Sequence, residues 1–169
     1  MTLSGSSDHF QGIGVGDKIF IALREWIMLQ PDFIFKRLLE QDLVSDDEAV
    51  ARGLANKAHP RELQSNEKLY TKGDKANFIF LVLDGSCELV DGSGVLHIIE
   101  RGTFLGEFPL LGVGKVYAVT AVASEKCVLA QVSYADFRDI AAKHPKIWER
   151  MASKLARRLN DRSRPPTKR

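Results

Sequence analysis

The first third of the chain has helical periodicity. Apolar side chains recur at helical spacing over residues 18–29, and Pro31 suits the first turn of a second helix. Residues 45–48, Ser-Asp-Asp-Glu, have the form of a capping box, which predicts a third helix that begins at Ser45 and runs to about residue 57. Residues 1–16 are small, polar and glycine-rich. We therefore expect a disordered lead-in over 1–16 and N-terminal helices over 17–58.

The pattern changes to β-strands between residues 62 and 133. Six short apolar runs, rich in β-branched residues, are separated by glycine-containing turns. Such spacing is typical of an antiparallel barrel or jelly roll and not of a βαβ fold. The fold class we expect is α+β, an antiparallel β jelly-roll barrel flanked by N-terminal helices and C-terminal helices, with the barrel and the C-terminal helices over 59–160. The runs are 68–71, 78–83, 86–90, 95–99, 117–123 and 127–132.

Helical spacing returns after the last strand. Residues 133–143 predict one helix, and a second is expected to start at Pro145. An apolar stripe on this second helix either packs on the barrel or pairs with a second copy, and we expect a homodimer through it. Residues 161–169 have the composition of a linker. The stripe consists of Ile147, Met151, Leu155 and Leu159.

Composition narrows the class of protein. The chain is 44% hydrophobic and 27% charged, as in ordinary globular domains, and it has no apolar run long enough for a membrane span. The first residues lack a basic start followed by an apolar stretch, so we expect no signal peptide and a cytoplasmic location. Cys87 and Cys127 lie in apolar runs, which favours buried thiols in a reducing compartment over a disulfide.

The net charge of +2 is unevenly distributed. From Lys146 onward, nine basic residues are accompanied by two acidic ones. A basic tail is found in nucleic-acid-binding proteins, but a solvated helix face produces the same pattern more often. No helix-turn-helix follows Leu159, so we expect no DNA-binding domain here. The four histidines are scattered, which argues against a metal cluster or a catalytic triad; they are His9, His59, His97 and His144.

One segment between two strands carries the candidate chemistry. Residues 102–115, here called the cassette loop, are bracketed by glycines, and Pro109 fits the first position of a short helix. Backbone N–H groups at a helix N-terminus bind anions, and Glu107 is a strong hydrogen-bond acceptor beside them. This combination suits a ligand with a hydroxyl and a phosphate, such as a ribose phosphate. A plain surface loop with an exposed glutamate explains the same pattern equally well.

The stretch Phe104–Leu111 resembles the phosphate-binding cassette of the cyclic nucleotide-binding domain family. The turn at residues 72–74, the strand and glycine turn at 80–86, and Gly102 shortly before Phe104 match further features of that family, and the resemblance covers about residues 62–159. It implies a non-enzymatic sensor that binds a cyclic mononucleotide and needs no cofactor. The ligand-binding residues it implies are Phe104, Leu105, Gly106, Glu107, Phe108, Leu110, Leu111, Lys115, Tyr117, Ala118 and Thr120.

The resemblance also assigns roles. Glu107 is expected to accept a hydrogen bond from the ribose 2′-hydroxyl, the Gly106 amide to support the same sugar, and amides around Leu110 to approach the phosphate. The helix after the barrel is expected to cover the base, with Trp148, Met151 or Leu155 near it.

The cassette departs from the family at one position. The family's phosphate arginine lies nine or ten residues after the glutamate, where this chain has Val116 and Tyr117. Losing a charged hydrogen bond of this kind weakens binding by about 1.5–3 kcal/mol. Pro109 also lacks a backbone N–H. Lys115 and Tyr117 are the main candidates to compensate, with Arg101 and Thr120 as further ones.

Two functions remain open on these grounds. The first is a sensor for a cyclic mononucleotide, with a cyclic pyrimidine nucleotide such as cUMP as the narrower possibility. The order of barrel, long basic helix and Arg-Ser-Arg-Pro-Pro at residues 162–166, together with residues 155–162, is similar to the regulatory half of bacterial antiphage effectors of the Pycsar type. In those effectors such a domain precedes a TIR NADase domain. The second is a degenerate barrel that serves only in dimerisation or docking, which would explain the missing arginine.

Overall fold

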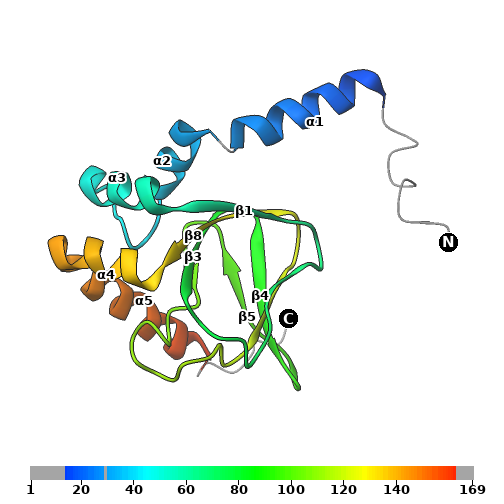
Figure 1. Ribbon diagram of the computed structural model, residues 1–169. Coiled ribbons are helices and arrows are strands. Elements are labelled where there is room, and N and C mark those ends of the chain that lie inside the picture. The colour runs from blue at the N-terminus through cyan, green and yellow to red at the C-terminus, as the bar shows by residue number, and fades with distance from the viewer. Residues whose placement is uncertain (1–13, 29, 163–169) are drawn as a thin grey trace.

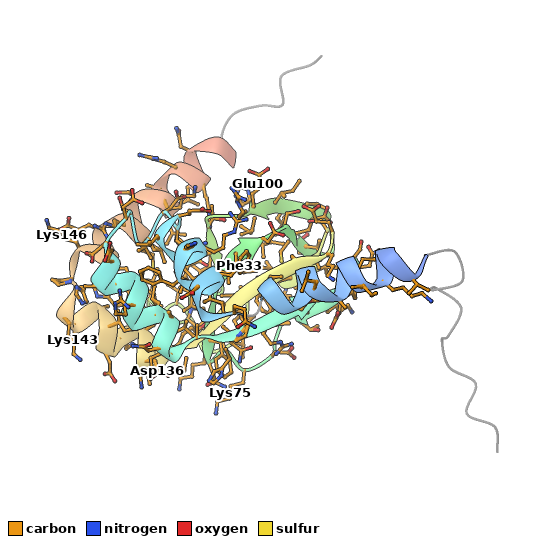
Figure 2. All side chains as sticks on the ribbon, turned by 90° about the horizontal axis from the view of Figure 1, so that it is seen from above. Phe33, Lys75, Glu100, Asp136, Lys143 and Lys146 are labelled. Carbon is orange, nitrogen blue, oxygen red and sulfur yellow. The ribbon has the colours of Figure 1, made fainter. Side chains whose placement is uncertain are left out.

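The computed structural model describes residues 14–28 and 30–162 (Figure 1). The lead-in expected over 1–16 lies mostly outside these residues, but Val15 and Gly16 already belong to helix α1 (Val15–Met28). Helix α2 (Pro31–Leu39) has proline in its first turn, and α3 (Glu48–Lys57) ends where the sequence predicts. Both views show α1 extending away from the body formed by the other elements (Figures 1 and 2).

The start of α3 differs from the sequence prediction. Asp47 is the N-cap, and its carboxylate accepts hydrogen bonds from the backbone N–H groups of Ala49 and Val50. Ser45 and Asp46 have φ angles of 52° and 61°, in the left-handed region, and such residues cannot begin a right-handed helix. The capping box at Ser45 was therefore wrong by two residues, and an aspartate replaces the serine in the same role.

Within residues 14–28 and 30–162, eight strands form two antiparallel four-stranded sheets that face each other. One sheet has the order β1-β8-β3-β6 and the other β2-β7-β4-β5. This arrangement confirms the predicted α+β fold with an antiparallel jelly-roll barrel, although each sheet remains open at its edges. The strands are β1 (His59–Leu63), β2 (Lys68–Tyr70), β3 (Phe78–Asp84), β4 (Ser86–Asp91), β5 (Gly94–Glu100), β6 (Phe104–Leu105), β7 (Thr120–Ala123) and β8 (Cys127–Ser133).

The two sheets have different surroundings. Strands β3 and β8 are buried at nearly every position, because helices α2, α3 and α4 (Tyr134–Lys143) cover the outer face of their sheet. Strand β7 alternates between half-buried and buried residues, as expected when one face of a sheet is solvated. The molecule therefore has three layers: helices, a doubly covered sheet and a sheet with one face to solvent (Figure 1).

Three strand predictions need correction. Strand β1 is absent from the predicted runs, the first of which begins at residue 68. It contains Pro60 and is an edge strand, where a residue without an N–H is tolerated. The run at 117–123 forms a strand only from Thr120 onward. Residues Phe104 and Leu105, expected outside any strand, form β6, and Leu105 pairs with Phe80 of β3.

Helix α5 (Lys146–Arg162) carries the predicted apolar stripe. Ile147 and Met151 are fully buried in the chain's own core, Leu155 is half-buried and Leu159 is 60% exposed. The first half of the stripe therefore packs on this molecule. The helix also includes residues 161 and 162, which the sequence placed in the linker, and residues 163–169 lie outside the described residues.

The loop between α2 and α3, residues 40–47, connects the barrel to α5. The side chain of Gln41 donates a hydrogen bond to the Val82 carbonyl of β3 (2.9 Å). The guanidinium of Arg150 on α5 donates to the carbonyl of Val44 (2.7 Å). The loop therefore contacts the last helix and the central sheet together. Within the described residues, no helix is both long and apolar enough to cross a membrane.

Candidate nucleotide site

Apart from strand β6 at its start, the cassette loop is built from turns and contains no helix. The amide of Leu111 donates to the carbonyl of Glu107 (3.0 Å), and the amide of Val113 donates to that of Phe108 (2.9 Å). These bonds close the loop on itself without continuing into helical structure. The short helix expected at Pro109 is therefore wrong, and with it the argument from a helix dipole.

Gly106 is the point at which the cassette loop packs closely against β3. Its φ is 82°, and a Cβ there would lie 3.0 Å from the carbonyl oxygen of Phe78 and 3.3 Å from the ring of Tyr117. Glycine is therefore required by both conformation and space. The hydroxyl of Tyr134 donates a hydrogen bond to the Gly106 carbonyl (2.5 Å), which ties the loop to the start of α4.

Tyr117, where the family arginine is expected, is directed into the barrel. Its hydroxyl donates to the carbonyl of Phe78 (2.9 Å), and its ring stacks on that of Tyr70 with centroids 3.8 Å apart. Burial raises the pKa of Tyr117 and Tyr70, and the negative charge of Glu107 raises the pKa of Tyr70 further. Both hydroxyls therefore stay protonated, and that of Tyr117 is a neutral donor that ties the segment after the cassette loop to β3.

The carboxylate of Glu107 lies under the cassette loop and is only 3% exposed. It pairs with Arg158 of α5, whose Nη1 is 3.5 Å from Oε1. Arg158 is itself 9% exposed, donates from Nη2 to the carbonyl of Phe104 (2.5 Å), and places its guanidinium carbon 4.6 Å from the centre of the Phe104 ring. A buried carboxylate of the cassette is thus joined directly to the C-terminal helix.

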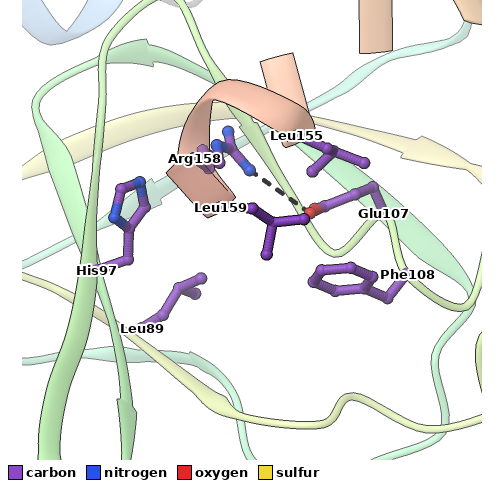
Figure 3. A pocket seen from close by; sticks show the side chains of 7 residues that line it. All are labelled: Leu89, His97, Glu107, Phe108, Leu155, Arg158 and Leu159. Carbon is purple, nitrogen blue, oxygen red and sulfur yellow. Dashed lines mark hydrogen bonds and ion pairs between the residues drawn. The ribbon is translucent and has the colours of Figure 1, made fainter. Parts of the chain in front are cut away.

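A small hollow lies at this contact (Figure 3). Its volume is about 40 Å³, room for a few water molecules. Pockets for drug-sized ligands measure about 300–1,000 Å³. A nucleotide can therefore enter only if α5 or its side chains move. The lining residues are Leu89 of β4, His97 of β5, Glu107 and Phe108 of the cassette loop, and Leu155, Arg158 and Leu159 of α5.

Of the residues expected from sequence, Glu107 and Phe108 line this hollow, and Gly106 adjoins them. Phe104 and Leu105 are fully buried in β6, and Leu110 is buried with its carbonyl bound by Arg138 (3.1 Å). The others are not among the lining residues: Leu111, Lys115 and Ala118 are exposed, Tyr117 is buried, and half-buried Thr120 accepts a hydrogen bond from the Lys72 amide.

Among the residues expected to cover a base, Leu155 lines the hollow. Met151 is fully buried, and Trp148 packs edge-on against Phe137 with ring centroids 5.5 Å apart. These two side chains anchor α5 on the helical layer. They set the angle at which the rest of the helix reaches the cassette loop.

Sequence reasoning missed Arg158 and His97. Arg158 was counted among the basic residues of a solvated tail, yet it lies seven residues after Met151 and three after Leu155, on the buried face of the helix. That spacing was the available signal. His97 gave none, because its place at the hollow depends on pairing between distant strands. Among the described residues no group of three His, Cys, Asp or Glu could hold a metal ion.

Known proteins match this chain in sequence. The family model of the cyclic nucleotide-binding domain matches residues 60–144. The Pycsar effector protein XpPycTIR of Xanthomonas perforans is 29% identical over 126 residues, which are 75% of this chain and 42% of that protein. The cAMP-activated global transcriptional regulator CRP of Salmonella typhimurium is 30% identical over 106 residues, 60% of this chain and 50% of that protein. The chain spans half or less of the length of these two relatives.

Solved structures match the fold. Thermus thermophilus catabolite activator protein superimposes with a TM-score of 0.59 at 25% identity, covering 68% of this chain and 55% of that one. The structure of PKAR CBD2 bound to Sp-2Cl-cAMPS gives a TM-score of 0.65 at 19% identity, covering 81% and 94%. The family match extends over half of the chain and includes both sheets and the buried Glu107. The chain belongs to the cyclic nucleotide-binding domain family.

Proposed function

We propose that this chain is a sensor domain that binds a cyclic mononucleotide between the cassette loop and α5. The observation that carries the proposal is the buried carboxylate of Glu107, which lines the hollow and pairs with Arg158. A carboxylate accepts hydrogen bonds only, and burying one is costly without donors. A ribose 2′-hydroxyl is a donor of the required kind.

Ligand binding and the position of α5 are coupled in this proposal. Three of the seven residues that line the hollow belong to α5, and the hollow is too small for a nucleotide in the present arrangement. A ligand therefore has to shift α5 or re-aim its side chains as it enters. The shift is the signal, and the domain itself carries out no catalysis.

The narrower proposal concerns the base and the output. Two relatives are named Pycsar effector proteins, one from Xanthomonas perforans and one from Pseudomonas aeruginosa, and both extend well beyond the matched region. The resemblance to that class favours a cyclic pyrimidine nucleotide such as cUMP in antiphage signalling, with α5 controlling a downstream effector domain in the cytoplasm.

Isothermal titration against cAMP, cGMP, cCMP and cUMP tests this function. We expect binding of at least one of them, and Glu107→Ala should weaken it by about 1.5–3 kcal/mol while the protein stays folded. Glu107→Gln keeps the shape and removes the charge. Glu100→Ala, at an exposed carboxylate of β5, is the matched control and should bind as the parent does. Unchanged affinity in folded Glu107 variants would contradict the proposed role of this residue.

A second function is favoured by one observation. Tyr117 stands where the family has an arginine and is held by Phe78, which fits a barrel that has lost its ligand and acts in dimerisation or docking. If no cyclic mononucleotide binds below about millimolar, where the binding free energy is about 4 kcal/mol, this second function replaces the first.

A further inference from the structure

The missing cassette arginine leaves a charge to be explained. A 3′,5′-cyclic phosphate is anionic, and an anion removed from water needs a charged or strongly polar partner. Tyr117 is a neutral donor already engaged with Phe78, and Lys115 is exposed on the outer part of the cassette loop. Neither is among the residues that line the hollow.

Arg158 is the one guanidinium among the described residues that line the hollow. We infer that Arg158, carried on α5, supplies the positive charge for the phosphate of the ligand in place of a cassette arginine. The inference rests on the proposed function above. It goes beyond that function in locating the phosphate contact on α5 instead of in the barrel.

Ligand chemistry places the phosphate near Arg158. In a 3′,5′-cyclic nucleotide the carbon that bears the 2′-hydroxyl is bonded to the carbon that bears a phosphate oxygen. If Glu107 accepts the 2′-hydroxyl, the phosphate therefore lies close to the same carboxylate. The guanidinium is 3.5 Å from that carboxylate, so both anionic groups come within its reach.

Electrostatics requires a cation at this point. The carboxylate of Glu107 and a cyclic phosphate would repel each other in a site with little water. A guanidinium between them attracts both, and its planar fork with five N–H donors can contact two anions at once. The bond from Arg158 to the Phe104 carbonyl and the packing on the Phe104 ring hold the guanidinium at this position from the barrel side.

The inference is tested by combining changes in the protein at Arg158 with removal of the phosphate from the ligand. Titrations of cUMP and cAMP are compared with those of uridine and adenosine, which lack the phosphate, for the parent chain, Arg158→Ala and Arg158→Lys. We expect Arg158→Ala to bind the better cyclic nucleotide about 10- to 150-fold more weakly, as for loss of a charged hydrogen bond. Its affinity for the nucleoside should change less than about threefold on the same scale, and Arg158→Lys should lose part of the binding because lysine lacks the fork.

Two controls and a salt series sharpen the result. Arg157→Ala removes an exposed charge from the next position of α5 and should bind as the parent does. The affinity of the parent for the cyclic nucleotide should fall with rising NaCl more steeply than that of Arg158→Ala, because salt screens the long-range attraction between the anionic ligand and the positive charge that the variant lacks. This salt series decides the matter even where nucleosides bind too weakly to titrate. Circular dichroism and thermal melting establish that the variants are folded.

Three results would overturn the inference. In the first, folded Arg158→Ala binds the cyclic nucleotide with parental affinity and salt dependence. In the second, Arg158→Ala loses nucleoside and cyclic nucleotide equally, which places Arg158 on the sugar or in helix docking. In the third, Lys115→Ala removes the phosphate preference instead. Failure of the parent chain to bind any cyclic nucleotide is a separate outcome that overturns the proposed function itself.

Discussion

Individual residues in and beside the cassette loop have separate roles: Glu107 faces the hollow, while Gly106 and the neighbouring Tyr117 hold the loop in place. Gly106 is confined by Phe78 and by the ring of Tyr117, and the hydroxyl of Tyr117 is bound to the Phe78 carbonyl. The loop is thus fixed on the side away from α5. Its carboxylate is correspondingly presented toward the helix.

Tyr117→Phe separates a structural from a ligand-binding role for this hydroxyl. We expect the free energy of unfolding to fall by about 1 kcal/mol, because the carbonyl of half-buried Phe78 loses this donor. Urea denaturation measures this change. Ligand affinity should stay within about twofold, far less than the loss of a charged contact. Weaker binding at unchanged stability would instead place the hydroxyl on the ligand.

Gly106→Ala and Gly112→Ala form a matched pair. Both glycines have φ near +80°, where alanine costs roughly 1–2 kcal/mol. Only at Gly106 does the added Cβ meet the Phe78 carbonyl at 3.0 Å; at Gly112 nothing lies within 4 Å. Chemical denaturation should therefore show a larger loss of stability for Gly106→Ala. Equal losses would mean that the loop can shift away from β3 without cost.

At the scale of elements, α4 depends on its first turn. The Ser133 hydroxyl accepts a hydrogen bond from the Asp136 amide (3.1 Å) and donates to the Asp136 carboxylate (2.7 Å), which also pairs with Lys57 of α3 (3.1 Å). The hydrogen bond from Ser133 and then that from Lys57 lower the pKa of Asp136. The turn therefore links α4 to α3 on the outer face of the central sheet.

The Ser133 and Asp136 pair predicts a dependence of stability on pH. Since the pKa of Asp136 is lower in the folded state, its stabilising effect is complete above the unfolded value near 3.8 and is lost as the pH falls below it. Asp136→Asn should therefore be less stable than the parent at pH 7, and the difference should shrink at pH 3. Ser133→Ala should cost about 1 kcal/mol at pH 7 as a lost N-cap. Urea denaturation at both pH values measures this, and a difference for Asp136→Asn that persists at pH 3 would contradict it.

Local sequence signals predicted most elements, and long-range contacts explain the failures. Turn residues and apolar runs located β3, β4, β5 and β8, because the limits of these strands are visible in the residues next to them in sequence. Strand β1 was hidden by Pro60, whose tolerance at a sheet edge depends on which strands become neighbours. The cassette glutamate was found from its motif. Its partner Arg158 lies 51 residues away, so only the folded chain brings the two together.

At the scale of the whole molecule, α5 serves the core and the site at once. Its first half is buried with the helical layer, and its second half reaches the cassette loop with Leu159 exposed. Of the apolar stripe, only the second half is therefore available for a symmetric contact between two copies. The exposed residues Phe108 and Leu111 of the cassette loop add further apolar surface to the molecule.

We propose that Leu159 contributes to a homodimer. The parent chain should be dimeric at high micromolar concentration, whereas Leu159→Glu should be monomeric and still folded, because a buried charge opposes association. Asn160→Glu adds the same charge at the neighbouring exposed position and should remain dimeric. Light scattering coupled to gel filtration measures the masses. A monomeric parent, with and without cyclic nucleotide, would exclude the dimer.

The loop of residues 40–47 contacts both α5 and the central sheet. It holds α5 through the Arg150 guanidinium and through an ion pair between Lys154 and Asp42, and it holds the central sheet through Gln41. A ligand that repositions α5 must work against these bonds. Thermodynamic linkage is reciprocal, so whatever loosens this loop changes the affinity for the ligand by the same factor as the ligand loosens the loop. In the proposed sensor, the affinity for the ligand could thus be changed through residues 40–47, none of which lines the hollow.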